Sequence, residues 1–146
     1  MVRFRVATAL VAAGLSCATP ALADGSQSGA EKLRRLDIML MVTSLRCRGG
    51  RDDFIAEYGR FTSSHMRKLN DANAQLRERF GERMLDRIST SMANQFGRGH
   101  PWLGCADLRM ATRNLAGVQG IGTLEEAADQ LLSPRGHATQ WARRDR

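Results

Sequence analysis

The fold is set by residues 31–47, EKLRRLDIMLMVTSLRC. Apolar residues recur in this stretch at steps of three and four, which is typical of an amphipathic α-helix. They form two neighbouring stripes, one made of Leu33, Leu36, Leu40 and Cys47 and the other of Ile38, Met41 and Leu45. A helix that is apolar over so wide an arc is usually central in its domain. We therefore expect this helix to lie at the centre of a bundle and to end at Arg48-Gly49-Gly50.

The same spacing continues through a second and a third helix. Asp52 or Asp53 is expected to begin the second, long helix as an N-terminal cap. Its inner side is predicted to carry Phe54, Tyr58, Phe61, His65, Leu69, Ala72 and Leu76. After an interruption at Gly81, a third helix is expected to turn Met84, Leu85, Ile88, Met92 and Phe96 inward. Gly97-Arg98-Gly99 then ends that helix.

Two shorter helices are predicted to complete the domain. His100-Pro101 is expected to open the fourth, because proline is favoured at the first helical position. Its inner side would hold Trp102, Cys105, Leu108, Thr112 and Leu115. Thr123-Leu-Glu-Glu126 matches a capping box and predicts the start of a fifth helix. No run alternates as a half-buried strand does, so we predict an all-α protein, a small bundle of four to five helices.

Export is predicted from the N-terminal residues. Residues 1–23 combine two early arginines, a short apolar run and Ala21-Leu-Ala23, the layout of a secretory signal peptide with cleavage near Ala23. Residues 24–30 read as a polar, flexible leader and residues 31–132 as the helical domain. No segment is apolar enough to anchor the chain in a bilayer, which needs about 20 residues. A periplasmic or secreted location is expected.

The cysteines fit that location. After cleavage, Cys47 and Cys105 remain, each on the inner side of a predicted helix. An even pair in a small exported chain most often forms a disulfide, and we predict one here. The alternative is a reactive Cys105 thiol with His100 as its base, but no third group that would orient the base lies nearby. His100 is instead expected to cap the fourth helix.

The excess positive charge of the predicted mature chain lies mostly in residues 133–146, and the remaining charge of the helical domain is small and scattered. The full sequence has 22 Lys+Arg and 15 Asp+Glu, a formal net charge of +7. The arginines are interspersed with carboxylates, whereas a nucleic-acid binder concentrates charge on one face with aromatics to stack on bases. We expect no nucleic acid as a partner. Residues 133–146 read as a basic disordered tail, in which Trp141, Arg143 and Arg144 would make weak contact with an anionic surface.

Five residues form a candidate pocket between the long helix and the fourth helix: Tyr58, Phe61, His65, His100 and Trp102. His65 within an aromatic seam is usually a hydrogen-bonded core residue. As a metal ligand it would need partners, but no His-x-x-x-His, Cys-x-x-Cys or Glu-x-x-His pair is present. The methionines are spread singly and read as core filler. We predict no metal and no cofactor.

The paired carboxylates are interpreted as structural. Asp52-Asp53 and Glu125-Glu126 both stand at predicted helix starts, where the helix dipole favours acidic residues. We read them as caps and predict no general acid/base pair and no catalytic residue.

The residues Arg46-Cys47, Asp53-Phe54, Tyr58, Phe61 and His65, followed by His100-Pro101-Trp102 and Cys105, give the chain a recognisable layout. It resembles short exported bacterial helical proteins of unknown function. Some of these carry the label S-adenosylhomocysteine hydrolase. That enzyme is several-fold longer and binds NAD on a Rossmann domain, and this chain has neither the length nor the βαβ pattern.

The sequence therefore predicts an exported, non-enzymatic binding or interaction protein. Its partner would be a protein of the cell envelope or a small ligand. Two alternatives remain open at this point: a carrier of a small ligand or metal, and a small hydrolase that uses His65 together with Tyr58 or Asp53.

Overall fold

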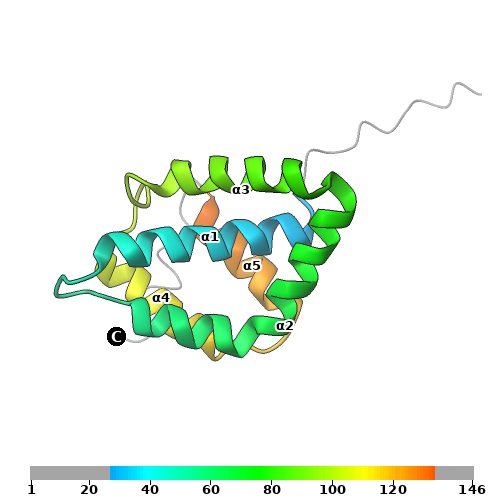
Figure 1. The fold of residues 1–146 in the computed structure, drawn as a ribbon. Coiled ribbons are helices and arrows are strands. Elements are labelled where there is room, and N and C mark those ends of the chain that lie inside the picture. The colour runs from blue at the N-terminus through cyan, green and yellow to red at the C-terminus, as the bar shows by residue number, and fades with distance from the viewer. Residues whose placement is uncertain (1–26, 134–146) are drawn as a thin grey trace, which may run out of the picture.

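The computed structural model describes residues 27–133, which form five α-helices and no strand (Figure 1). The helices are α1 (Gly29–Cys47), α2 (Ile55–Phe80), α3 (Glu82–Phe96), α4 (Cys105–Ala116) and α5 (Ile121–Leu132). The predicted all-α bundle is confirmed. The predicted signal peptide, most of the predicted leader and the Trp141, Arg143 and Arg144 of the predicted tail lie outside the described residues.

Helix α1 is the centre of the bundle, as its wide apolar arc predicts. It contacts each of the other four helices. In Figure 1 it runs between α3 and the first half of α2. The first predicted stripe is fully confirmed, because all four of its members are buried: Leu33, Leu36, Leu40 and Cys47.

The second predicted stripe of α1 is only partly buried. Ile38 lies in the core, but Met41 is 36% exposed and Leu45 is 56% exposed. The prediction of a second continuous inward stripe is therefore wrong. Leu45 lies seven residues after Ile38 and so points to nearly the same side of the helix, which shows that the other helices cover this side at Ile38 but not towards the C-terminal end of α1.

The start of α1 is fixed by a capping box that the sequence reading missed. The Ser28 hydroxyl accepts a hydrogen bond from the Glu31 amide (3.3 Å), and the Glu31 carboxylate accepts one from the Ser28 amide (2.9 Å). These bonds satisfy amides that have no partner inside the helix. Helix α1 therefore begins at Gly29, two residues before the predicted start at residue 31.

Helix α2 follows the predicted long seam. Its buried residues include Phe61, His65, Ala72 and Leu76. The N-terminal cap of this helix is Phe54 and no side chain caps it, so the prediction of Asp52 or Asp53 as the cap is wrong. The Asp53 carboxylate instead accepts hydrogen bonds from the amides of Ile55 (3.0 Å) and Gly49 (2.9 Å) and holds the turn before the helix. The helix ends at Gly81, whose φ of +73° is in the left-handed region that glycine adopts without a side-chain clash. Helix α3 begins at the next residue.

The predicted starts of the last two helices are wrong. Helix α4 begins at Cys105, not at His100-Pro101, because the His100 ring accepts the amide of Leu103 (3.2 Å) and thereby folds residues 100–103 into a turn. Helix α5 begins at Ile121 after Gly120, and no side chain caps it, so Thr123 is not the cap of a capping box.

The predicted disulfide joins Cys47, the last residue of α1, to Cys105, the first residue of α4. The two Cα atoms are 5.8 Å apart. The bridge therefore fixes the end of the central helix against the start of α4. Among residues 27–133, no helix combines the length and the apolar character needed to cross a membrane.

Candidate functional site

The predicted pocket residues fall into two groups. Tyr58, Phe61 and His65 are neighbours on α2, with ring centroids 6.4 Å apart between Tyr58 and Phe61 and 5.2 Å apart between Phe61 and His65. His100 and Trp102 lie in the connection between α3 and α4, with their rings edge to face at 4.8 Å. Of the five, only His100 lines the cavity beside the disulfide.

His65 is part of the core. Its side chain is 2% exposed, and its Nε2–H donates to the carbonyl oxygen of Leu115 at 2.7 Å. The opposite ring nitrogen, Nδ1, is buried and has no hydrogen-bond partner. The ring thus ties α2 to the end of α4 through a single bond, which is the structural role expected of a core histidine.

Tyr58 belongs to a polar cluster that joins α1, α2 and α3. Its hydroxyl donates to Asp37 at 2.9 Å, and Arg34 contacts both Asp37 (3.7 Å) and the Ser89 hydroxyl (3.2 Å). Burial raises the pKa of Asp37, although Tyr58 and Arg34 oppose this effect. Burial and the Asp37 carboxylate together raise the pKa of Tyr58 far above its usual value, so the phenol stays protonated and is a poor nucleophile.

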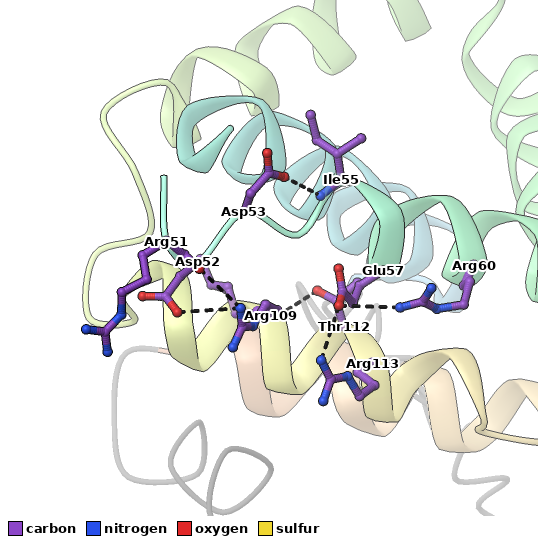
Figure 2. A network of polar contacts seen from close by, with 10 residues as sticks. Arg51, Asp52, Asp53, Ile55, Glu57, Arg60, Arg109, Thr112 and Arg113 are labelled. Carbon is purple, nitrogen blue, oxygen red and sulfur yellow. Dashed lines mark hydrogen bonds and ion pairs between the residues drawn. The ribbon is translucent and has the colours of Figure 1, made fainter. Parts of the chain in front are cut away.

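A second polar cluster joins α2 and α4 (Figure 2). Glu57 is buried and accepts from Arg113 at 3.2 Å and from Arg60 at 3.3 Å. Burial raises the pKa of Glu57, but bonds from its own backbone amide and from Arg113 outweigh burial, and the net pKa is below the usual value. Asp52 faces Arg109 at 3.7 Å. Both carboxylates lie in ion pairs with arginines, and neither pairs with a second acid.

A third group of polar side chains lines a cavity beside the disulfide. Its volume is about 230 Å³, and it lies where α1 ends, where the α3–α4 connection passes and where α4 begins. The described residues that line it are Thr43, Arg46, Cys47, Arg98, Gly99, His100, Leu103, Gly104, Cys105 and Leu108. We call it the disulfide cavity, because both bridged cysteines belong to its wall.

The lining is positively charged. Arg46 and Arg98 both contribute, and no Asp or Glu is among the described lining residues. Neither arginine forms an ion pair with a carboxylate of residues 27–133. The nearby Asp107 is engaged in accepting the amide of Gly104 at 3.3 Å. The guanidinium groups therefore keep donors for a further partner.

His100 contributes a neutral ring to this wall. Its Nδ1 accepts from the Leu103 amide, so the proton sits on Nε2, which donates to the carbonyl of Leu131 at 2.9 Å. Burial lowers the pKa of His100, and the bond to Leu131 opposes this only in part. The ring holds the α3–α4 connection against the end of α5. It is not free to act as a base for Cys105, which is oxidised in the disulfide.

A second cavity of about 270 Å³ lies between α1 and α3. Arg35 is the one charged side chain among its described lining residues, and its NH2 group donates to Gln95 at 3.0 Å. Although this cavity is slightly larger, its walls are not joined covalently and its described lining holds one arginine where the disulfide cavity holds two. The disulfide cavity is the stronger candidate site.

Sequence reasoning identified the cysteines and His100 but missed Arg46 and Arg98. The signal was their position: Arg46 directly precedes Cys47, and Arg98 stands between the glycines that end α3. Once the disulfide is assumed, both arginines are brought to the same end of the bundle. Among residues 27–133, no three His, Cys, Asp or Glu side chains lie close enough together to hold a metal ion.

The functional assignment depends on this geometry. No protein-family model, curated protein or solved structure matches the chain.

Proposed function

We propose that this protein is an exported, non-enzymatic binding protein of the cell envelope whose site is the disulfide cavity. The observation that carries the proposal is the wall of that cavity. A covalent bridge fixes it, and it holds two arginines without a carboxylate partner in the described residues. A preformed concave site with a few polar groups is the usual form of a small-ligand site.

Export is supported by the N-terminal pattern of residues 1–23 and is compatible with the disulfide. Disulfides persist in oxidising compartments such as the bacterial periplasm and are rare in the cytosol. The Cys47–Cys105 bridge therefore agrees with a protein that leaves the cytoplasm.

A role without covalent chemistry is supported because the side chains that could react are already hydrogen-bonded within the protein. His65 bonds to Leu115, His100 bonds to Leu131 and Leu103, and Tyr58 bonds to Asp37. A general base must reach the proton that it abstracts in a substrate. His65 is 2% exposed and lines neither of the two cavities described above, which weakens the hydrolase alternative.

The proposal is tested by screening a library of small polar and apolar fragments against the mature protein by amide NMR. We expect the fragments that bind to shift the amide signals of Leu103, Cys105 and Leu108. If binding maps elsewhere, or if no fragment binds, the cavity is not the site. A hydrolytic activity that is lost in His65→Asn would contradict the non-enzymatic role.

A protein partner is the second candidate, and Trp102 favours it. This tryptophan is 40% exposed and stands beside His100 at the same end of the bundle. Tryptophan is enriched among the residues that dominate protein–protein interfaces. If an envelope protein binds, and Trp102→Ala abolishes that binding while Met66→Ala does not, this candidate is favoured over a small ligand. Met66 is the matched control because it is also apolar and 58% exposed, on α2.

A further inference from the structure

We propose that the disulfide cavity binds a small organic carboxylate, with Arg46 and Arg98 as its binding residues. The inference rests on the proposed function, because it assumes that the cavity is a binding site. It adds the chemical class of the ligand and the residues that recognise it.

The two arginines reach the cavity from different parts of the chain. Arg46 comes from the last turn of α1, and Arg98 comes from the α3–α4 connection. The disulfide joins α1 to the residue that begins α4, so it sets the distance between these two segments. An anion between the arginines would meet positive charge from both.

Arg46 is already held in place. Its NH1 group donates to the carbonyl of Gly97 at 3.1 Å, and this bond restrains the position of the guanidinium. A guanidinium has five N–H donors, so most remain for a ligand. Because the fork is held before binding, less side-chain entropy is lost when a carboxylate accepts two parallel hydrogen bonds from it.

Gly99 gives this part of the wall its backbone conformation. Its φ is +105°, a backbone conformation that residues with a side chain rarely adopt. A Cβ atom at this position would lie 3.4 Å from Nε of Arg46, which is ordinary van der Waals contact. The positive φ therefore requires the glycine, and the backbone at residue 99 lies beside the guanidinium at the cavity wall.

The rest of the wall is apolar and neutral. Leu103, Leu108 and the disulfide form its apolar part. His100 cannot neutralise the arginines, because it carries no negative charge and both of its nitrogens are engaged. Apolar walls exclude water and so strengthen an ion pair formed against them. These surroundings fit an anion with a short carbon chain better than a bare inorganic ion.

The volume limits the size of the ligand. About 230 Å³ is below the roughly 300–1,000 Å³ of pockets that hold drug-sized molecules. The cavity therefore accommodates a molecule of a few carbon atoms and is too small for a nucleotide or a dinucleotide cofactor. Short mono-, di- and tricarboxylates are the class that matches both charge and size.

The test is a calorimetric and NMR titration of the mature, oxidised protein with acetate, succinate and citrate. Inorganic phosphate serves as the inorganic anion, and succinamide as the neutral analogue of succinate. We expect at least one of the three carboxylates to bind, with amide shifts at Gly99, Leu103 and Cys105, and to bind more tightly than phosphate or succinamide. Higher salt should weaken the binding, because it screens partly exposed charges.

The variants Arg46→Gln and Arg98→Gln should each weaken carboxylate binding by about tenfold or more, since charge-assisted hydrogen bonds are lost. Arg67→Gln is the matched control: Arg67 is an exposed arginine of α2 that lies outside the cavity lining. Thermal melts of all three variants check that they fold. The inference is supported if Arg46→Gln and Arg98→Gln weaken carboxylate binding and Arg67→Gln does not.

The failures are distinguishable. If phosphate binds as tightly as the best carboxylate, the site recognises negative charge only, and the carboxylate class is wrong. If succinamide or a neutral fragment binds at the same amides and the two substitutions change nothing, the arginines are not binding residues, although the cavity remains a site. If neither carboxylates nor fragments bind there, both the inference and the proposed function are wrong.

Discussion

At the scale of single residues, His100 connects the α3–α4 connection to another helix through its ring. One ring nitrogen bonds to the Leu131 carbonyl at the end of α5, and the other accepts the Leu103 amide. The second bond requires an unprotonated nitrogen, so a proton added there removes it. Burial also favours the unprotonated ring, because it lowers the pKa of His100 below the usual 6.5.

A pH dependence of stability follows. A histidine whose pKa is lowered in the folded state takes up its proton more readily in the unfolded chain. Its contribution to stability is therefore fully present above pH 6.5 and is lost as the pH falls below that value through the lower pKa of the folded state. We expect the melting temperature to fall between pH 7.5 and pH 5, and to fall less in His100→Gln. An equal fall in both proteins would contradict this role.

At the scale of elements, one buried carboxylate links α2 and α4 in addition to the bond of His65 to Leu115. Glu57 forms one ion pair with Arg60 of its own helix and one with Arg113 of α4 (Figure 2). Both arginines are 59% exposed, so each ion pair is screened by water. Removal of either one leaves Glu57 with the other partner. Removal of both leaves a buried charge without a counter-ion, which is far more costly.

The two arginines should therefore be non-additive. Each of Arg60→Ala and Arg113→Ala is expected to lower the free energy of unfolding by about 0.2–1 kcal/mol, as for exposed ion pairs. The double variant should exceed the sum of the two by about 0.5 kcal/mol or more. Urea denaturation measures all three. Arg67→Ala, an exposed arginine of α2 outside this cluster, serves as the control, and a strictly additive double variant would show that Glu57 does not need a counter-ion.

The elements also show how far sequence reasoning reaches. The three-and-four spacing of Leu33, Leu36 and Leu40 predicted α1 and its central place, because helix burial follows that period. The start of α4 could not be predicted in the same way. His100-Pro101 has the local pattern of a helix start, but the His100 ring accepts the Leu103 amide, and the ring is held in that orientation by its bond to Leu131, which lies 31 residues further along the chain. Local rules do not include such a contact.

The site was harder to predict than the fold for the same reason. The cysteine count and the predicted export were enough to predict the disulfide. The disulfide cavity, in contrast, exists only after α1, the α3–α4 connection and α4 have packed together. Arg46 and Arg98 are 52 residues apart in the sequence, and only their positions relative to the bridged cysteines indicate that they are neighbours.

At the scale of the whole molecule, the disulfide closes a long stretch of chain. Cys47 and Cys105 are 58 residues apart, and the enclosed segment contains α2 and α3. A cross-link of this span removes conformational entropy from the unfolded chain. On that model it stabilises the fold by about 4 kcal/mol, a large part of the 5–15 kcal/mol of a typical domain.

The double variant Cys47→Ser/Cys105→Ser tests this contribution. We expect a loss of about 4 kcal/mol in the free energy of unfolding, measured by urea denaturation. The helical content should remain, because α1 still packs against the other four helices. A variant as stable as the oxidised protein would show that the bridge does not stabilise the fold.

The central position of α1 has a consequence for how the protein is made. The ribosome, and then any export channel, delivers the chain from its N-terminus, so α1 emerges first and α5 last. Yet α1 contacts α5 directly, and its apolar stripe is not fully covered until that final helix arrives. The nascent chain must therefore leave the ribosome with the apolar stripe of α1 uncovered, and we expect a holding chaperone to bind α1 before the later helices.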